Sequence, residues 1–278
     1  MLPTDFSKNA TNAIHYALQL FNDEKCTFYL FNSYAPPVNT GTTMRASSAM
    51  EVVLDISKEN SKKDLESTLE TLLKTYSNPL HTYQTVSRYD YFLGAVKDAV
   101  KEFSIDLIVM GTKGASGLKE VVMGSNTAEI IGYSNCHVLA VPEGARFKPL
   151  QEIAFVTNFD FYFNKWEVTP LTELARKFNA SIKIMNVDEK RKGLTEDQKA
   201  VKNHLENLLK GYNHEIFTLS GANVDTATRL FTQSRNIDLI TMVTRKYSFF
   251  ERLFHKPKAE EISYHTSIPL LVLNPQEG

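Results

Sequence analysis

Short apolar runs alternate along the whole chain with longer segments in which apolar residues recur every three or four positions. The short runs predict buried strands, and the longer segments predict amphipathic helices. In the first half we expect strands at 28–31, 81–87, 106–110 and 138–141, and helices after 4–6 and near 50–76, 91–103 and 127–133. In the second half we expect strands at 153–157, 182–186, 215–219, 238–242 and 270–273, and helices near 164–178, 196–209, 225–234 and 258–265.

The same order of elements occurs twice, and two pairs of segments align without a gap. Ser104-Ile-Asp-Leu-Ile-Val-Met110 matches Asn236-Ile-Asp-Leu-Ile-Thr-Met242, and the same offset places 138–141 on 270–273. Alternating strands and helices predict right-handed βαβ units and parallel sheets covered on both faces. We therefore predict an α/β protein of two tandem, open, five-stranded parallel sheets, with domains at 1–143 and 151–278 and a linker at 144–150.

The first strand of the first half is expected to be short. In the second half this strand begins near Glu152, whereas its first-half counterpart has only Met1, Leu2 and Pro3 before the turn at Thr4. Either the natural start lies upstream of Met1, or the first sheet accommodates a shortened strand. We predict a shortened strand with an incomplete ladder.

Composition and charge narrow the choice of partners. The 31 basic and 32 acidic residues nearly cancel, so the chain lacks the basic excess that a nucleic-acid partner normally requires. No apolar run is long enough to span a bilayer and no basic-then-apolar leader is present, which favours a cytoplasmic protein without a membrane partner. Cys26 and Cys136 have no metal-ligand spacing and are interpreted as free thiols.

A glycine-rich segment after the strand at 106–110 is the strongest candidate for chemistry. Gly111 and Gly114 are followed nine residues later by Gly124-Ser125, which opens a predicted helix. Glycine lets the backbone approach a ligand closely, and a helix start offers unpaired N–H groups and the positive end of the helix dipole. The pattern is neither a P-loop nor a dinucleotide fingerprint, but it indicates a phosphate site.

Two further motifs stand beside this segment. Pro3-Thr-Asp-Phe-Ser7 lies at the end of the first strand, and Cys136-His-Val-Leu-Ala-Val-Pro142 contains the last strand of the first half. Together with the spaced glycines, they resemble the universal stress protein family over residues 1–143 and, more weakly, 151–274. The resemblance implies the adenine-nucleotide α-hydrolase-like fold, with ATP or AMP, with or without Mg²⁺, bound across the carboxyl ends of the strands.

The family resemblance also assigns roles to single positions. Asp5 would contact the ribose or adenine beside Pro3 and Thr4, and Ser33 would offer backbone groups to the adenine edge. Met110 and Gly111 would lie under the ribose and α-phosphate. The phosphates would be wrapped by N–H groups and hydroxyls of Gly114, Gly124, Ser125, Asn126 and Thr127.

Some of these positions also have purely structural interpretations. Asp5 and Ser7 are good helix N-cap residues, and one carboxylate can serve both as a cap and as a ligand contact. Alternatively, Gly114 and Gly117 could have no role beyond shaping a surface turn, although Gly124-Ser125 at the next helix start favours an anion site. Both interpretations stay open at this stage.

The second half has lost the glycine pattern. The same offset places Val243, Lys246, Lys256 and Pro257 on Gly111, Gly114, Gly124 and Ser125, and Asn158 takes the place of Asp5. Side chains with a Cβ disfavour positive φ, and proline lacks the N–H that a phosphate needs. We predict no nucleotide there. The basic and aromatic segment 245–258 is interpreted as a helix that plugs the empty site, with a patch for an acidic partner as the alternative.

No catalytic constellation accompanies the predicted site. The sequence has no nucleophile elbow and no histidine–glutamate metal motif, and its seven histidines are scattered. We therefore expect a regulatory nucleotide-binding protein of the stress response rather than a dedicated enzyme. The alternatives are a weak ATPase or autophosphorylating protein, with Ser125 or Thr127 near the γ-phosphate, and a nucleotide-free scaffold. Family members often dimerise through their last strands, so strands 138–141 and 270–273 are expected to pair as an intrachain pseudo-dimer, with a homodimer of chains as a further possibility.

Overall fold

The computed structural model describes residues 1–35, 48–112, 124–243 and 267–275. The first half comprises β1 (Leu2–Pro3), α1 (Lys8–Leu20), β2 (Cys26–Tyr34), α2 (Ser48–Thr75), β3 (His81–Tyr89), α3 (Phe92–Glu102), β4 (Leu107–Gly111), α4 (Ser125–Tyr133) and β5 (His137–Val141). The second half comprises β6 (Glu152–Val156), α5 (Lys165–Phe178), β7 (Ser181–Asp188), α6 (Glu196–Leu208), β8 (His214–Ser220), α7 (Val224–Ser234), β9 (Leu239–Val243) and β10 (Leu270–Leu273). The predicted order of elements is confirmed, except that the helix near 258–265 lies outside the described residues.

The strands form two hydrogen-bonded groups, ordered β1-β2-β3 and β4-β5-β10-β9-β6-β7-β8. The gap between the groups falls at β1, whose two residues pair in parallel with Leu30 and Phe31 of β2. On its other side, Met1 lies opposite Ile108 of β4: its nitrogen donates to Leu107 O at 2.7 Å, and its oxygen accepts from Val109 N at 2.9 Å. The prediction of a shortened first strand with an incomplete ladder is confirmed.

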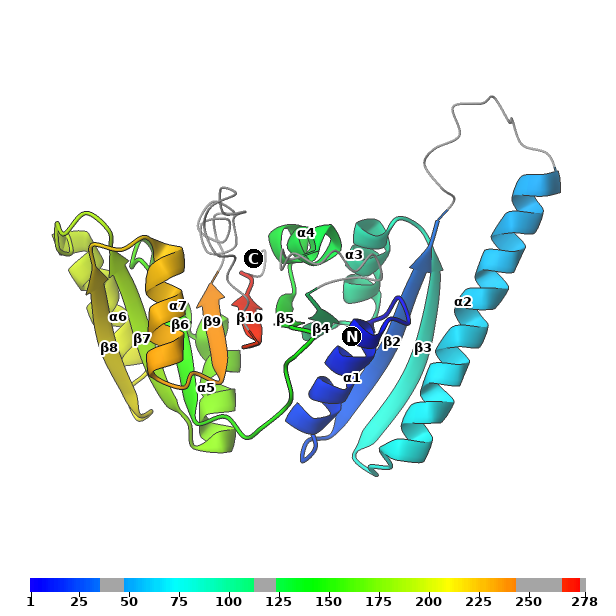
Figure 1. Ribbon diagram of the computed structural model, residues 1–278, viewed down its shortest axis with the longest axis horizontal. Coiled ribbons are helices and arrows are strands. Elements are labelled where there is room, and N and C mark those ends of the chain that lie inside the picture. The colour runs from blue at the N-terminus through cyan, green and yellow to red at the C-terminus, as the bar shows by residue number, and fades with distance from the viewer. Residues whose placement is uncertain (36–47, 113–123, 244–266, 276–278) are drawn as a thin grey trace.

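The two halves meet where β5 and β10 pair antiparallel, at the centre of Figure 1. Ala140, Leu139 and Val138 lie opposite Leu270, Leu271 and Val272. Each half would otherwise present an unpaired edge strand, and the pairing removes both edges from solvent. The predicted intrachain pseudo-dimer is therefore confirmed.

Two hydrophobic cores run through both halves, one on each face of the sheets. One core collects the inward side chains of α1, α2, α5 and α6, and the other collects those of α3, α4 and α7. The first core crosses from one half to the other at Phe147, whose ring contacts Tyr16 of α1 and Phe178 of α5. Near the same place Lys177 donates to Leu20 O at the end of α1 and pairs with Glu24. The halves are joined through their cores as well as through the antiparallel pairing of β5 with β10, which we call the seam.

Local sequence explains where several helices begin. Ser7 Oγ accepts from Ala10 N at the start of α1, and Asn223 Oδ1 accepts from Thr226 N at the start of α7. Thr195 and Gln198 form a reciprocal capping box at the start of α6. Such side chains satisfy N–H groups that have no partner inside the helix. By contrast, α4 has Gly124 at its N-cap and no side-chain cap.

Candidate functional site

A tight turn follows β1 at the carboxyl edge of the sheet. Thr4 N donates to Phe31 O at 2.8 Å, which extends the ladder by one bond. Thr4 Oγ1 then accepts from Phe6 N at 2.9 Å, and Phe6 has a φ of 62°. Because this left-handed conformation disfavours most side chains, the hydrogen bond to Thr4 helps to hold the turn. The turn leaves Asp5 exposed at the strand end.

The structure separates the roles of Asp5 and Ser7. Ser7 is the N-cap of α1. Asp5 lies two residues before this N-cap, and its Oδ1 accepts from Ser7 N at 3.1 Å. The capping interpretation therefore holds for Ser7 itself. Asp5 supports the turn and stays at the edge where the predicted ribose or adenine contact would be made.

A buried polar network supports the turn from below. Asn32 Nδ2 donates to Thr4 O at 2.8 Å, and Asn32 Oδ1 accepts from Ser61 Oγ of α2 at 2.8 Å. Ser61 is 4% exposed, and its oxygen lies 2.7 Å from Ser87 Oγ of β3. Sequence reasoning missed Asn32 and Ser61. The available signal was an asparagine at the same place in both halves, Asn32 and Asn186, each at the end of an apolar strand.

The remaining predicted residues of the strand ends lie at the same edge. Pro3 is buried in β1, and Ser33 lies next to Asn32 in β2, in register with Arg88 of β3. Met110 is 6% exposed, and its side chain belongs to the core beneath α3 and α4. The predicted contacts of these residues with a ligand remain predictions.

Gly111 is needed for packing. A Cβ at this position would lie 3.2 Å from Asn9 O in the first turn of α1, closer than ordinary van der Waals contact. The glycine therefore lets α1 approach the end of β4 closely. This reason is independent of a ligand, and the sequence pattern alone did not reveal it.

Two hydrogen bonds connect the described residues on either side of segment 113–123. Thr112 N donates to Val141 O at 3.1 Å, and Gly124 N donates to Thr112 O at 2.7 Å. These bonds bring the start of α4 beside the end of β4. Gly114 and Gly117 lie outside the described residues, so their predicted roles stay predictions.

The first turn of α4 contains both exposed and buried residues. Ser125 and Asn126 are exposed, whereas Thr127 is 2% exposed and its Oγ1 donates to Gly111 O at 2.9 Å. The hydroxyl of Thr127 thus anchors the helix to β4, which narrows its predicted phosphate contact to the backbone N–H. Gly124, the N-cap, has no side chain and so provides no cap for the first N–H groups of the helix.

The second half repeats the turn but covers it. Thr157 Oγ1 accepts from Phe159 N at 3.0 Å and Phe159 has a φ of 55°, as at Thr4 and Phe6. Here Gln198 Nε2 of α6 donates to Asn158 O at 3.1 Å and to Asp160 Oδ1 at 3.2 Å. The side chain of Gln198 therefore crosses the end of β6, where a ligand would approach.

Val243, the counterpart of Gly111, and the start of α5 also differ from the first half. Val243 ends β9 and is 4% exposed. The helix after the turn, α5, begins eight residues beyond Thr157, whereas α1 begins four residues beyond Thr4. The other three substituted positions, Lys246, Lys256 and Pro257, and the segment 245–258 lie outside the described residues. The predicted loss of a site in the second half therefore remains a prediction, which the Gln198 contacts support.

Comparison with known proteins identifies the family of the chain. Residues 1–142 match the universal stress protein family. The chain belongs to this family. A universal stress protein of Methanocaldococcus jannaschii is 25% identical over 145 residues, which cover 51% of this chain and 79% of that protein.

Solved universal stress proteins extend the comparison to the whole chain. One from Archaeoglobus fulgidus superposes with a TM-score of 0.67 at 14% identity, covering 98% of this chain and 97% of its own. This likeness establishes the tandem α/β fold over both halves. Another universal stress protein, solved in complex with cAMP, covers 50% of this chain with a TM-score of 0.36 and 20% identity.

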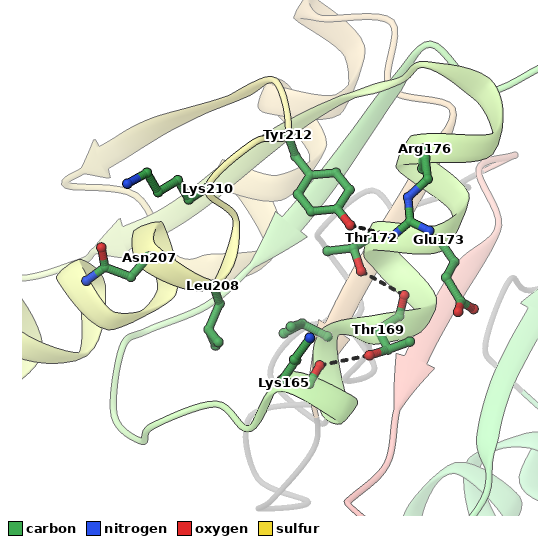
Figure 2. Close-up of a pocket in the computed structure, with 10 residues that line it drawn as sticks. Lys165, Thr169, Thr172, Glu173, Arg176, Asn207, Leu208, Lys210 and Tyr212 are labelled. Atoms are coloured by element: carbon green, nitrogen blue, oxygen red, sulfur yellow. Dashed lines mark hydrogen bonds between the residues drawn. The ribbon is translucent and has the colours of Figure 1, made fainter.

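Two hollows of this universal stress protein lie on helix faces rather than at the strand ends. The first, about 590 Å³, lies between α5 and the end of α6 and is shown in Figure 2. Arg176 Nη2 donates to Tyr212 OH at 2.7 Å across it, and this bond lowers the pKa of Tyr212. Thr169 Oγ1 and Thr172 Oγ1 donate to carbonyls of their own helix. The second, about 480 Å³, lies along α1 beneath the linker.

Titratable groups in the described ranges do not assemble a reactive centre. Burial raises the pKa of Cys136 to about 12, and its Sγ donates to Ile105 O, so this thiol is a poor nucleophile. Both cysteines are free thiols, as predicted. The described side chains include no group of three or more His, Cys, Asp or Glu that could hold a metal ion. None of the helices in these ranges is long and apolar enough to cross a membrane.

Proposed function

We propose that the first half of this universal stress protein binds one adenine nucleotide, ATP or AMP, at the carboxyl ends of β1, β2 and β4. The observation that carries the proposal is the meeting of three features at one edge. They are the turn with the exposed Asp5, the end of β4 at Gly111, and the start of α4 directly after its N-cap Gly124. Open parallel sheets generally bind ligands at this edge.

The start of α4 provides the proposed phosphate site. The N–H groups of Ser125, Asn126 and Thr127 occupy the first three positions of the helix, where the dipole adds partial positive charge. Gly124 has no side chain that could cap them. An anion there would satisfy groups that α1, α6 and α7 satisfy with their own side chains. Mg²⁺, where it takes part, would be held mainly by the phosphates of the nucleotide.

Binding rather than turnover is the proposed activity, in a cytoplasmic protein of the stress response. Asp5 is proposed to contact the ribose or adenine rather than to activate water, so hydrolysis would be assisted mainly by positioning and be slow. Autophosphorylation is the second candidate, and the exposure of the side chains favours Ser125 over Thr127 as the acceptor. The Ser125 side chain is exposed, whereas the Thr127 hydroxyl is buried against Gly111 O.

Association of two chains into a homodimer remains a separate proposal, which light scattering after size-exclusion chromatography tests.

Nucleotide release is the direct experiment. Freshly purified protein is denatured by heat, and the supernatant is separated by anion-exchange chromatography and read at the adenine absorbance. We expect up to one adenylate per chain, and ATP or AMP should raise the melting temperature of stripped protein. Absence of nucleotide together with no thermal shift would overturn the proposal. Incubation with γ-labelled ATP separates the two candidates: label that stays on Ser125 in wild type and disappears in Ser125→Ala favours autophosphorylation.

A further inference from the structure

The last described residues of the second half reach into the first half. Asn274 follows β10 directly, and it is 3% exposed. Its Nδ2 donates to Cys136 O at 2.8 Å and to Ser134 O at 2.9 Å, with Ile131 O at 3.3 Å. Its backbone N–H donates to His137 Nδ1 at 3.2 Å. The amide nitrogen carries two hydrogens, so the longest contact, to Ile131 O, shares a hydrogen with one of the other two. Because all three neighbours are acceptors, they also fix the orientation of the side chain.

Two of these carbonyls belong to the carboxyl end of α4. Ile131 lies in the last turn, and Ser134 is the C-cap residue. The last carbonyls of a helix have no partner inside the helix and must find one elsewhere when buried. Asn274 supplies that partner from the other half of the molecule, across the β5–β10 seam.

Besides the core packing of Ile130 and Ile131, side-chain hydrogen bonds hold α4 at both of its ends. Thr127 ties its first turn to Gly111 of its own half, and Asn274 ties its last turn to the second half. A nine-residue helix is ~13 Å long, so a swing of about 5° about its carboxyl end would displace the first N–H groups by ~1 Å. Such a displacement is large compared with the range of N–H···O distances that make a good hydrogen bond.

We call these contacts of Asn274 with the end of α4 the clamp, and among the described residues it runs in one direction, from the second half to the first. The offset of the repeat places Pro142 of the first half on Asn274 of the second. Proline has no side-chain donor, and its carbonyl instead accepts from Asn12 of α1 at 3.1 Å. The first half therefore cannot return an equivalent contact from this position. The asymmetry matches the asymmetry of the predicted sites, since the half with the intact glycine pattern receives the clamp.

We propose that Asn274 is a positioning residue for the phosphate-binding end of α4, so that nucleotide binding in the first half depends on the second half. The inference rests on the proposed function for its ligand, but its structural step, the fixing of α4, can be tested without a ligand. It gives the second half a role that requires no nucleotide of its own.

The test uses the full chain with Asn274→Asp and Asn274→Leu. Aspartate keeps the size of the side chain but places an acceptor against three carbonyls, whereas leucine only removes the donor. A packing role predicts that Asp is tolerated, and a donor role predicts that Asp is at least as damaging as Leu. Val201→Ala, in the core beneath α6, is the matched control that lowers stability away from the seam.

Two measurements are made on each variant. Hydrogen exchange of residues 127–136 is followed without nucleotide, and we expect faster exchange in both Asn274 variants but not in the control. The Kd for ATP is then measured by calorimetry well below the melting temperature, and we expect a rise of about tenfold, equal to ~1.4 kcal/mol. The control should bind like wild type, because loss of global stability alone does not change the Kd of folded protein.

The outcomes separate this inference from the proposed function. Exchange of α4 like that of wild type in both variants would overturn the fixing of α4 by Asn274. Faster exchange with an unchanged Kd would overturn the dependence of nucleotide binding on Asn274. If wild type binds no nucleotide, the proposed function fails and the dependence on Asn274 fails with it. The exchange data alone would then show whether Asn274 fixes α4.

Discussion

The turns after β1 and β6 share a backbone but differ in what surrounds them. In both, a threonine hydroxyl accepts from the N–H two residues later, and a phenylalanine takes a positive φ. The first turn leaves Asp5 exposed, whereas Gln198 crosses the second at Asn158. The shared geometry therefore belongs to the fold, since it persists where the site residues have changed. Identification of a site requires the residues around the turn as well as the turn itself.

The support beneath the two turns differs in the same sense. Asn32 is bonded through both ends of its amide, to Thr4 O and to Ser61. Asn186 donates to Thr157 O at 3.2 Å, but its buried Oδ1 has no hydrogen-bond partner among the described residues. Val201 precedes the buried Leu205 by one helical turn, as Ser61 precedes the buried Leu65, so the position that supplies a hydroxyl in α2 is apolar in α6. The first turn is thus held more firmly.

The glycine positions should give the largest difference between the halves. Gly114→Val with Gly124→Val should weaken ATP binding at least about 100-fold, because a branched side chain at the N-cap blocks access to the α4 N–H groups. The free energy of unfolding should change by less than about 1 kcal/mol, since Gly124 is not packed in the core. Calorimetry and thermal melts measure the two quantities.

Lys256→Val is the matched change in the second half, and it should leave the affinity unchanged. A clear loss of ATP binding in this variant would contradict a single site in the first half.

The two buried asparagines should differ in stability by a smaller amount. Asn32→Leu leaves Thr4 O without its donor and removes one of the two hydrogen-bond partners of Ser61, the other being Ser87. It should lower the free energy of unfolding by about 2–3 kcal/mol. Asn186→Leu removes one longer bond together with an unpaired oxygen, so the cost should stay within about 1 kcal/mol. Denaturant titration of both variants provides the comparison. Equal losses would show that the hydroxyl of Ser61 contributes nothing to the support of the first turn.

The smallest expected effect concerns the pH dependence of the seam. Burial lowers the pKa of His137 below 6.5, against the opposing effects of Asp106 and Glu167. Its Nδ1 accepts from Asn274 N, and the Trp166 ring lies 5.6 Å away, so the folded state favours the neutral ring. The folded state then binds fewer protons than the unfolded state. The free energy of unfolding should be highest above pH 6.5 and fall as the pH is lowered through the folded-state pKa.

His137→Gln retains an acceptor that does not titrate, so it should flatten this part of the stability profile. Comparison with wild type by denaturant titration between pH 5 and 8 cancels other groups with lowered pKa, such as His15. Parallel stability profiles of wild type and His137→Gln would show that protonation of His137 does not affect the stability of the seam.

Much of the fold followed from local patterns in the sequence. The gap-free match of 104–110 with 236–242 predicted the duplication, and the matching strands 138–141 and 270–273 form the antiparallel seam. The packing reason for Gly111 was missed, because contact with Asn9 arises only when α1 folds onto β4. Asn32 and Ser61 were missed because a buried network joins residues far apart in sequence, each of which looks like a surface residue alone. Asn274 was missed for the same reason, since its acceptors lie about 140 residues earlier.

The seam between β5 and β10 also sets an order of events on the ribosome. β5 ends at Val141 and β10 begins at Leu270, so translation of the intervening stretch takes about 10 s at typical rates. During that interval the first half can already fold while its edge strand lacks a neighbour. Edge strands in this state pair readily with other chains, so crowded polysomes would favour contacts between nascent copies. Emergence of the last strand closes this interval, and the chain then occupies its own edge.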